Sequence, residues 1–240
     1  MYNDVAYAMA TAGKLLPTAL EYARKAVAEE EEASLKLKLS ELTVDDLPHT
    51  VRLAAFWDTL GWVYFQQGNF AQAEKFLNAS WMLSQHAEVA DHLRRVYEKQ
   101  HKTQAAARMQ RFVVPAAPGS AAAAAKLNPQ AASLNFNNPD LVNLRITKLD
   151  RFTKGTSSTE MFLLLAWDPA ASEFKVADWK AIPGSDKLHP SPQVMNSIHF
   201  KLSSPDSAPA HVVRRGILGC YEYTGCSIVL FEPDRVRSVN

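Results

Sequence analysis

The pattern of hydrophobic and polar positions changes twice along the 240 residues. Up to about residue 112, apolar residues recur at i, i+3, i+4 and i+7 among Ala, Leu, Glu, Lys and Gln, which predicts amphipathic helices. Residues 113–140 are rich in alanine and proline, a composition typical of a linker. From residue 141 onward, short β-branched and aromatic segments lie between Gly, Pro, Asp and Ser, which predicts strands.

The last part, residues 141–240, predicts a small α+β domain with a mainly antiparallel sheet. Its predicted strands lie in LVNLRITKL, EMFLLLAW, EFKVADWKAI, VVRRGILGC and CSIVLFEP. Pro190 and Pro192 restrict any helix between the third and fourth strands to a turn before PQVMNSI. The segment YEYTG, in which Gly225 supplies a positive φ, predicts a hairpin connection between the last two strands.

The helical part contains a repeat, and its clearest unit is WDTLGWVYFQQGNFAQAEKFL. A second, more divergent unit follows 33 residues later, and a weaker one precedes both around Gly13. In this register Gly13, Gly68 and His101 occupy the same position at the end of a first helix. The side chains predicted to pack within and between the helix pairs are Trp57, Leu60, Gly61, Tyr64, Ala73, Leu93, Tyr97 and Ala106.

The spacing Trp57, Leu60, Gly61, Tyr64 and Ala73 resembles the W-x₂-L-G-x₂-Y…A pattern of the tetratricopeptide repeat. This resemblance implies antiparallel helix hairpins, of which the chain has about three units in residues 1–112. The predicted fold class is therefore multidomain: tetratricopeptide-type all-α hairpins followed by the small α+β domain.

An insertion at residues 33–50 separates the weaker unit around Gly13 from the clearest unit, which begins at Trp57. The acidic run Glu29–Glu32 before it predicts a solvated helix end, and LKLKL alternates with period 2, which predicts a short extended arm.

The resemblance also implies a partner-binding groove on the concave face of the helical array. A protein or peptide is the expected partner, with Trp62 and Phe65 as aromatic anchors. This hypothesis requires Trp62 to be solvent-accessible, and the alternative is that the insertion or the C-terminal domain covers the face. The predicted groove residues are Asp58, Trp62, Phe65, Gln66, Asp91, Arg95, Glu98 and Lys99.

Composition and motifs predict a binding protein rather than an enzyme. The net charge of +1 gives no reason to expect nucleic acid as a partner. No apolar run reaches the roughly 18 residues of a membrane span, and the first residues lack a signal-peptide pattern, so the sequence as written predicts a cytoplasmic protein. The histidines lack the spacing of a metal site, and no nucleotide-binding or hydrolase motif occurs. We therefore expect no catalytic residues, no metal and no cofactor.

The two cysteines, Cys220 and Cys226, lie on either side of the predicted hairpin turn. On adjacent strands they could close a disulfide in an oxidising compartment, and two free buried thiols are the alternative.

A wider resemblance covers most of residues 1–112 and 141–240. The stretches AAFWDTLGWVYFQQGNF…VADHLRRVYEKQHK and VVRRGILGC…TGCSIVLFEPDRVRSVN are similar to the C-terminal part of large bacterial proteins of acidobacterial type. In these, tetratricopeptide repeats end in a small sheet domain whose strand order is similar to that of TonB C-terminal domains. Several are exported, and some carry a transglutaminase-like domain upstream. The resemblance implies an alternative function, a non-catalytic C-terminal segment of a larger exported enzyme (transglutaminase-like or hydrolase), which would lie in the periplasm. A further alternative, independent of the resemblance, is partner binding by β-augmentation at an exposed edge strand of the sheet.

Overall fold

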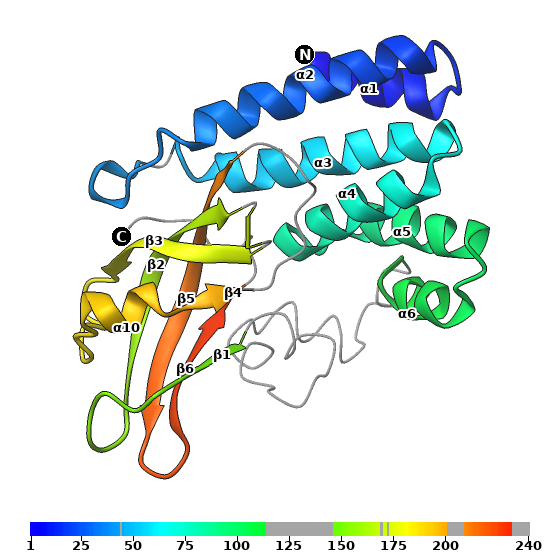
Figure 1. Ribbon diagram of the computed structural model, residues 1–240. Helices are drawn as coiled ribbons and strands as arrows, with labels where there is room; N and C mark the ends of the chain where they lie inside the picture. Colours follow the sequence, from blue (N-terminus) through cyan, green and yellow to red (C-terminus); the bar gives the residue numbers. More distant parts are fainter. Residues whose placement is uncertain (44, 114–145, 169, 172, 201–208, 232–240) are drawn as a thin grey trace, which may run out of the picture.

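The structure, a computed structural model, describes residues 1–43, 45–113, 146–168, 170–171, 173–200 and 209–231. Helices precede strands, as predicted (Figure 1). Consecutive helices pack in pairs: α1 with α2, α3 with α4 and α5 with α6. Their bounds are α1 (Tyr2–Thr11), α2 (Leu16–Ser34), α3 (Pro48–Gln66), α4 (Phe70–Leu83), α5 (Ala87–Lys99) and α6 (Thr103–Val113). Apart from Val113, the predicted linker at 113–140 lies outside the described residues.

The same turn joins the two helices of every pair. Gly13, Gly68 and His101 all have positive φ, of 65°, 77° and 58°. In each turn the N–H of this residue donates to the carbonyl three residues earlier, and the next N–H donates to the carbonyl five residues before its own. These two bonds form the Schellman motif that commonly ends a helix. His101 therefore occupies a left-handed position that a glycine fills without a steric penalty.

The residues predicted to pack within and between helix pairs are all buried: Trp57, Leu60, Gly61, Tyr64, Ala73, Leu93, Tyr97 and Ala106. At Gly61 the helices α3 and α4 approach so closely that an added Cβ would lie 2.7 Å from Cγ of Leu77. Because real Cβ atoms essentially never approach a carbon so closely, glycine allows the contact between the two helices at this position.

The C-terminal part is a six-stranded sheet in the order β1-β6-β5-β2-β3-β4, in which all neighbours are antiparallel. The five predicted segments all contribute strands, and a short helix, α10 (Pro192–Asn196), follows the third. The sequence pattern missed only β4, which has two residues. The strands are β1 (Ile146–Leu149), β2 (Ser157–Asp168), β3 (Glu173–Ala181), β4 (His199–Phe200), β5 (His211–Tyr221) and β6 (Gly225–Leu230).

A disulfide closes the hairpin between β5 and β6. Cys220 and Cys226 lie opposite each other in the register, with Cα atoms 4.0 Å apart, and their sulfur atoms are bonded. Gly225 has a φ of 83°, so the turn has the predicted backbone conformation. Of the two alternatives for these cysteines, the structure contains the disulfide.

The two outermost strands of the sheet order approach each other. Thr147 of β1 donates a hydrogen bond from Oγ1 to the carbonyl of His199 in β4, at 3.2 Å. Along β2, Leu163 and Leu165 belong to the main core, whereas Phe162 and Leu164 point to the opposite face. The sheet therefore curves so that its first and last strands meet, and both its faces carry buried residues.

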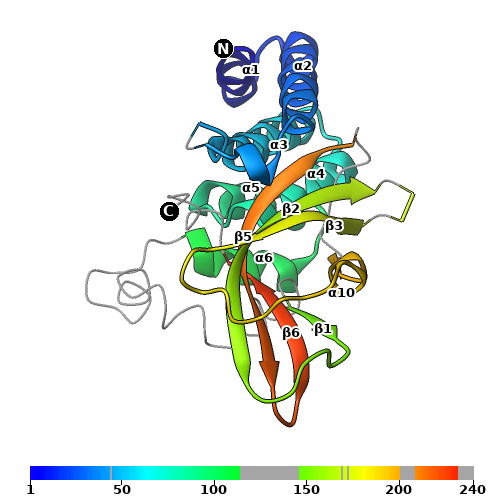
Figure 2. The same cartoon turned by 90° about the vertical axis from the view of Figure 1, so that its left-hand side faces the viewer.

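The helical array and the sheet meet along the edge of β5. This strand pairs with β2 from residue 211 onward but with β6 only from Gly216 onward. Before Gly216, side chains of α2 and α3 form hydrogen bonds with this edge of β5. Ser34 Oγ accepts from the N–H of His211 at 3.0 Å, and Thr50 Oγ1 accepts from the N–H of Val213 at 3.0 Å and donates to its carbonyl at 3.2 Å. Figures 1 and 2 show the upper end of β5 against the ends of α2 and α3.

The insertion between α2 and α3 packs against the sheet. It does not form the predicted extended arm: residues 39–41 form the 3-10 helix η1 (Leu39–Glu41). Leu37 and Leu39 are buried in a small core with Phe162, Leu164 and Val213. Leu37 and Leu39 therefore cover the outer apolar face of β2 and β5.

The prediction of a solvated acidic helix end was wrong for Glu30 and Glu31, which are both buried. Glu30 contacts His49 Nδ1 at 2.5 Å and Arg52 Nε at 3.2 Å. Glu31 accepts a hydrogen bond from the indole nitrogen of Trp57 at 3.4 Å. Helix α3 lies beside the end of α2, and it supplies the partners that these two carboxylates need when they are removed from water.

Candidate functional site

The predicted groove residues Trp62 and Phe65 lie in a stack of three rings on the surface of α3 and α5 that faces α1, here called the inner face. The Trp62 and Phe65 rings are 4.8 Å apart and 8° from parallel, and the Trp62 and His92 rings are 4.1 Å apart and 13° from parallel. Arg95 places its guanidinium 5.6 Å from the Trp62 ring. The predicted residues Trp62, Phe65 and Arg95 are therefore neighbours, and His92 joins them.

The inner face is covered from within the chain. Asp58 contacts His92 Nδ1 at 2.9 Å, and the Tyr7 ring of α1 lies 6.4 Å from the His92 ring. Tyr7 also donates a hydrogen bond to Glu88. Burial, and then the neighbouring Glu88 carboxylate, raise the pKa of Tyr7 to about 12. Side chains of α1 and α5 thus contact each other over the inner face.

The prediction that Trp62 is an accessible anchor was therefore wrong. Trp62 is 6 % exposed, as is Asp58. His92 stacks on Trp62 and pairs with Asp58, and Tyr7 lies beside His92. These side chains therefore occupy the space beside Trp62 and Asp58 that a bound peptide would need.

The other predicted groove residues lie along α5 and at the end of α3. Asp91 pairs with Arg95 at 2.8 Å and with Arg94 at 2.6 Å, and Arg94 also pairs with Glu98 at 2.6 Å. Burial acts to raise the pKa of Asp91, but the hydrogen bonds and charges of Arg94 and Arg95 outweigh it and lower that pKa. Gln66 is half-buried and Lys99 is exposed. The charges of Asp91, Arg95 and Glu98 are therefore paired within their own helix.

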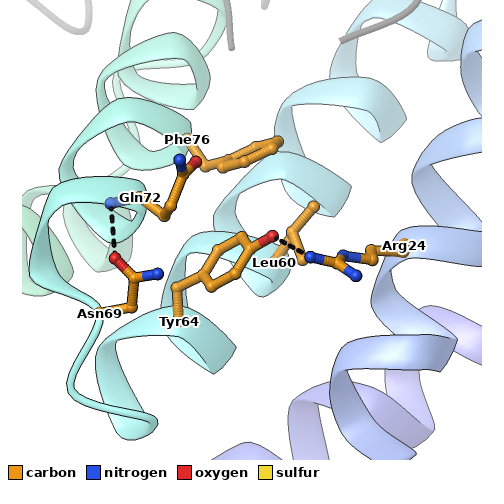
Figure 3. A pocket seen from close by; sticks show the side chains of 6 residues that line it. All are labelled: Arg24, Leu60, Tyr64, Asn69, Gln72 and Phe76. Carbon is orange, nitrogen blue, oxygen red and sulfur yellow. Dashed lines mark hydrogen bonds between the residues drawn. The ribbon is translucent and has the colours of Figure 1, made fainter. Parts of the chain in front are cut away.

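A second region is open to solvent: a pocket of about 420 Å³ between α2 and α4, with α3 at its base, here called the outer cleft (Figure 3). Six side chains from the three helices and the turn before α4 line it: Arg24, Leu60, Tyr64, Asn69, Gln72 and Phe76. Leu60, Tyr64 and Phe76 are buried and form an apolar base, whereas Arg24 and Asn69 are exposed at the rim. A concave site with an apolar base and a few polar groups is the usual form of a ligand site.

Arg24 and Tyr64 fix the geometry on one side of the outer cleft. The Nη2 atom of Arg24 donates to Tyr64 Oη at 2.9 Å, and its guanidinium lies 5.8 Å from the centre of the same ring. The Tyr64 ring stacks on Phe76 with centres 5.6 Å apart. No carboxylate in the described part of the chain forms an ion pair with Arg24, so its positive charge is available to a ligand.

Asn69 and Gln72 form the other side, at the start of α4. Asn69 is the N-cap of α4, and its Oδ1 accepts from the backbone N–H of Gln72 at 3.3 Å. The first turn of α4 contains no acidic residue. The positive end of the helix dipole is therefore not compensated by a side chain of that turn, and it adds to the charge of Arg24 at the rim.

The sequence prediction missed this region. Leu60 and Tyr64 were predicted as packing residues, and Arg24, Asn69 and Gln72 were not singled out. Arg24 follows an ordinary helical pattern in EYARKAV, and nothing in the sequence indicates that it lies beside a tyrosine 40 residues later. Only the packing of α2 against α3 brings the two side chains together.

The remaining predictions concern metals, membranes and sheet edges. Among the described residues, no group of three or more His, Cys, Asp or Glu side chains is arranged to hold a metal ion. Within the same residues, no helix is both long and apolar enough to cross a membrane. The β-augmentation alternative needs an accessible outer strand, and Thr147 of β1 already contacts His199 of β4.

The comparisons with known proteins add no relative. No protein-family model, no curated protein and no solved structure matches this chain.

Proposed function

We propose that the helical part is a tetratricopeptide-type array that acts as an adaptor, and that it binds a peptide segment of a partner protein in the outer cleft. The repeated Schellman turns at Gly13, Gly68 and His101 support the repeat, because the sequence register assigns these three residues to one position. The observation that carries the binding proposal is the open cleft itself, in which an apolar base lies below a positively charged rim.

The outer cleft is better suited to a partner than the inner face. A peptide on the inner face would have to displace Tyr7 and separate the Trp62–His92 stack, which costs the buried contacts of both. The cleft needs no such rearrangement, because its side chains are held on three helices. Preformed sites bind with less loss of conformational entropy than sites that must first open.

The sheet has a supporting role in this proposal. Ser34, Thr50 and the buried Arg214, which donates from Nη1 to the carbonyl of Met82 at 3.2 Å, connect the helices to β5. These contacts hold the helical array and the sheet in one orientation. An adaptor of this kind presents a bound segment in a fixed direction relative to its second part.

The test begins with peptides selected from a random display library against the whole chain. Their dissociation constants are then measured with two matched variants, Gln72→Trp at the outer cleft and Gln66→Trp at the end of α3. Both replace a half-buried glutamine by the same bulky residue. We expect Gln72→Trp to weaken binding at least tenfold and Gln66→Trp to change it less than twofold. Loss of binding with Gln66→Trp alone would place the peptide on the inner face and contradict the proposal.

A further inference from the structure

The outer cleft has a chemistry that goes beyond the ability to hold a peptide. This inference rests on the proposed function, because it names the ligand of the same site. We infer that the cleft selects an acidic segment: an Asp or Glu side chain of the partner pairs with Arg24, and an adjacent apolar side chain lies on the base formed by Leu60 and Phe76.

The first observation is the state of Arg24. Tyr64 Oη accepts from one of the five guanidinium N–H groups, and this bond orients the side chain toward the cleft (Figure 3). The guanidinium has no carboxylate partner among the described residues. By contrast, Arg52 pairs with Glu30, and Arg94 pairs with Asp91 and Glu98. An oriented and unpaired guanidinium is suited to a carboxylate, which it can bind with two parallel hydrogen bonds.

The second observation is independent of Arg24 and comes from α4. Its first turn lines the cleft with Asn69 and Gln72, has no acidic side chain, and carries the positive end of a 14-residue helix dipole. Asn69 uses its Oδ1 as the helix cap, which leaves its amide N–H₂ group as a donor. Both sides of the cleft therefore favour a negative charge between them.

The third observation is the base of the cleft. Tyr64 and Phe76 are less than 10 % exposed and Leu60 is 2 % exposed, so the base is a part of the core that reaches the surface. An apolar side chain next to the acidic one would contact the part of this base that reaches the surface. A volume of about 420 Å³ is at the small end of the range for ligand sites, which suits one or two side chains and not a folded domain.

The experiment uses the selected peptides and a double-mutant cycle. Each peptide is resynthesised with its acidic residue changed to the amide, Glu to Gln or Asp to Asn, and separately with an amidated C-terminus. Dissociation constants are measured by isothermal titration or fluorescence anisotropy with the wild-type chain and with Arg24→Gln, at two salt concentrations.

We expect the side-chain amide to weaken binding to the wild-type chain about fivefold, with less than a twofold effect on binding to Arg24→Gln. The expected factor is moderate because Arg24 starts from an exposed position. Added salt should weaken binding of the acidic peptide and leave the amide peptide almost unchanged. Amidation of the C-terminus should have no effect.

A further variant separates recognition from packing. Tyr64→Phe removes the hydrogen bond that orients Arg24 but keeps the aromatic ring and the charge. This variant should keep a preference for the acidic peptide, at a reduced level, while Arg24→Gln should lose it at an unchanged melting temperature.

The outcomes distinguish this inference from the proposed function. Peptides that Gln72→Trp excludes but that bind equally well with or without the carboxylate would overturn the inference and leave the proposed function standing. An equal effect of the side-chain amide on the wild-type chain and on Arg24→Gln, or a requirement for the C-terminal carboxylate, would also overturn it. Peptides that Gln72→Trp does not affect would contradict both.

Discussion

Removal of the Thr50 hydroxyl tests most directly how the helices are connected to the sheet. Thr50 is 3 % exposed, and its Oγ1 bonds both the N–H and the carbonyl of Val213. Thr50→Val keeps the volume and the β-branch, so it opens no cavity and leaves both backbone groups without this partner. Since an unsatisfied buried polar group costs about 1–3 kcal/mol, we expect the free energy of unfolding to fall by about 2–4 kcal/mol.

The assay is urea unfolding, combined with hydrogen exchange at the amide of Val213, which should speed up in the variant. Thr103→Val at the exposed start of α6 is the control and should change stability by no more than about 0.5 kcal/mol. A loss below about 0.5 kcal/mol in Thr50→Val, with unchanged exchange at Val213, would refute the role given to this contact.

Three further predictions concern single positions. His101→Gly should raise the free energy of unfolding by about 0.5–1 kcal/mol in urea unfolding, because glycine adopts the φ of 58° without a steric penalty. The control variant His101→Ala should show no such gain. Gly61→Ala should lower the free energy of unfolding by about 1–3 kcal/mol, because the added Cβ would clash with Leu77, although alanine is the better helix former. A stabilised variant would show that α3 and α4 do not approach each other closely enough at this position for such a clash. Burial lowers the pKa of His211, so the unfolded chain takes up the proton at higher pH than the folded chain and stability falls as the pH drops below about 6.5. Between pH 7.5 and 5.5 the wild-type chain should therefore lose more stability in urea unfolding than His211→Asn, and equal losses would contradict this.

Local signals were sufficient to predict much of the fold. Helical spacing, the register of Gly13, Gly68 and His101, and the Gly225 turn are all determined by residues close in sequence, and the structure has the corresponding helices and turns. The β4 strand was missed because two residues cannot show an alternating pattern. The Ser34 and Thr50 contacts to β5 also left no signal, because they join residues more than 160 positions apart.

The candidate site was harder to predict for the same reason. The aromatic residues of the inner face were predicted, but the burial of Trp62 depends on His92, which stacks on Trp62 and lies beside Tyr7 only in the folded array. The alternating leucines of the insertion looked like an extended arm because a period of 2 cannot indicate which surface will cover them. Arg24 has an ordinary place in its own helix, and only its neighbours on α3 and α4 make it part of a cleft.

The central claim is that a partner segment binds in the outer cleft and not on the inner face. The most direct measurement is photocrosslinking of a selected peptide to two forms of the chain, one with p-benzoylphenylalanine in place of Gln72 and one with it in place of Gln66. The account predicts a covalent adduct from position 72, which an excess of unlabelled peptide abolishes, and little or none from position 66. An adduct from position 66 without one from position 72 would contradict it.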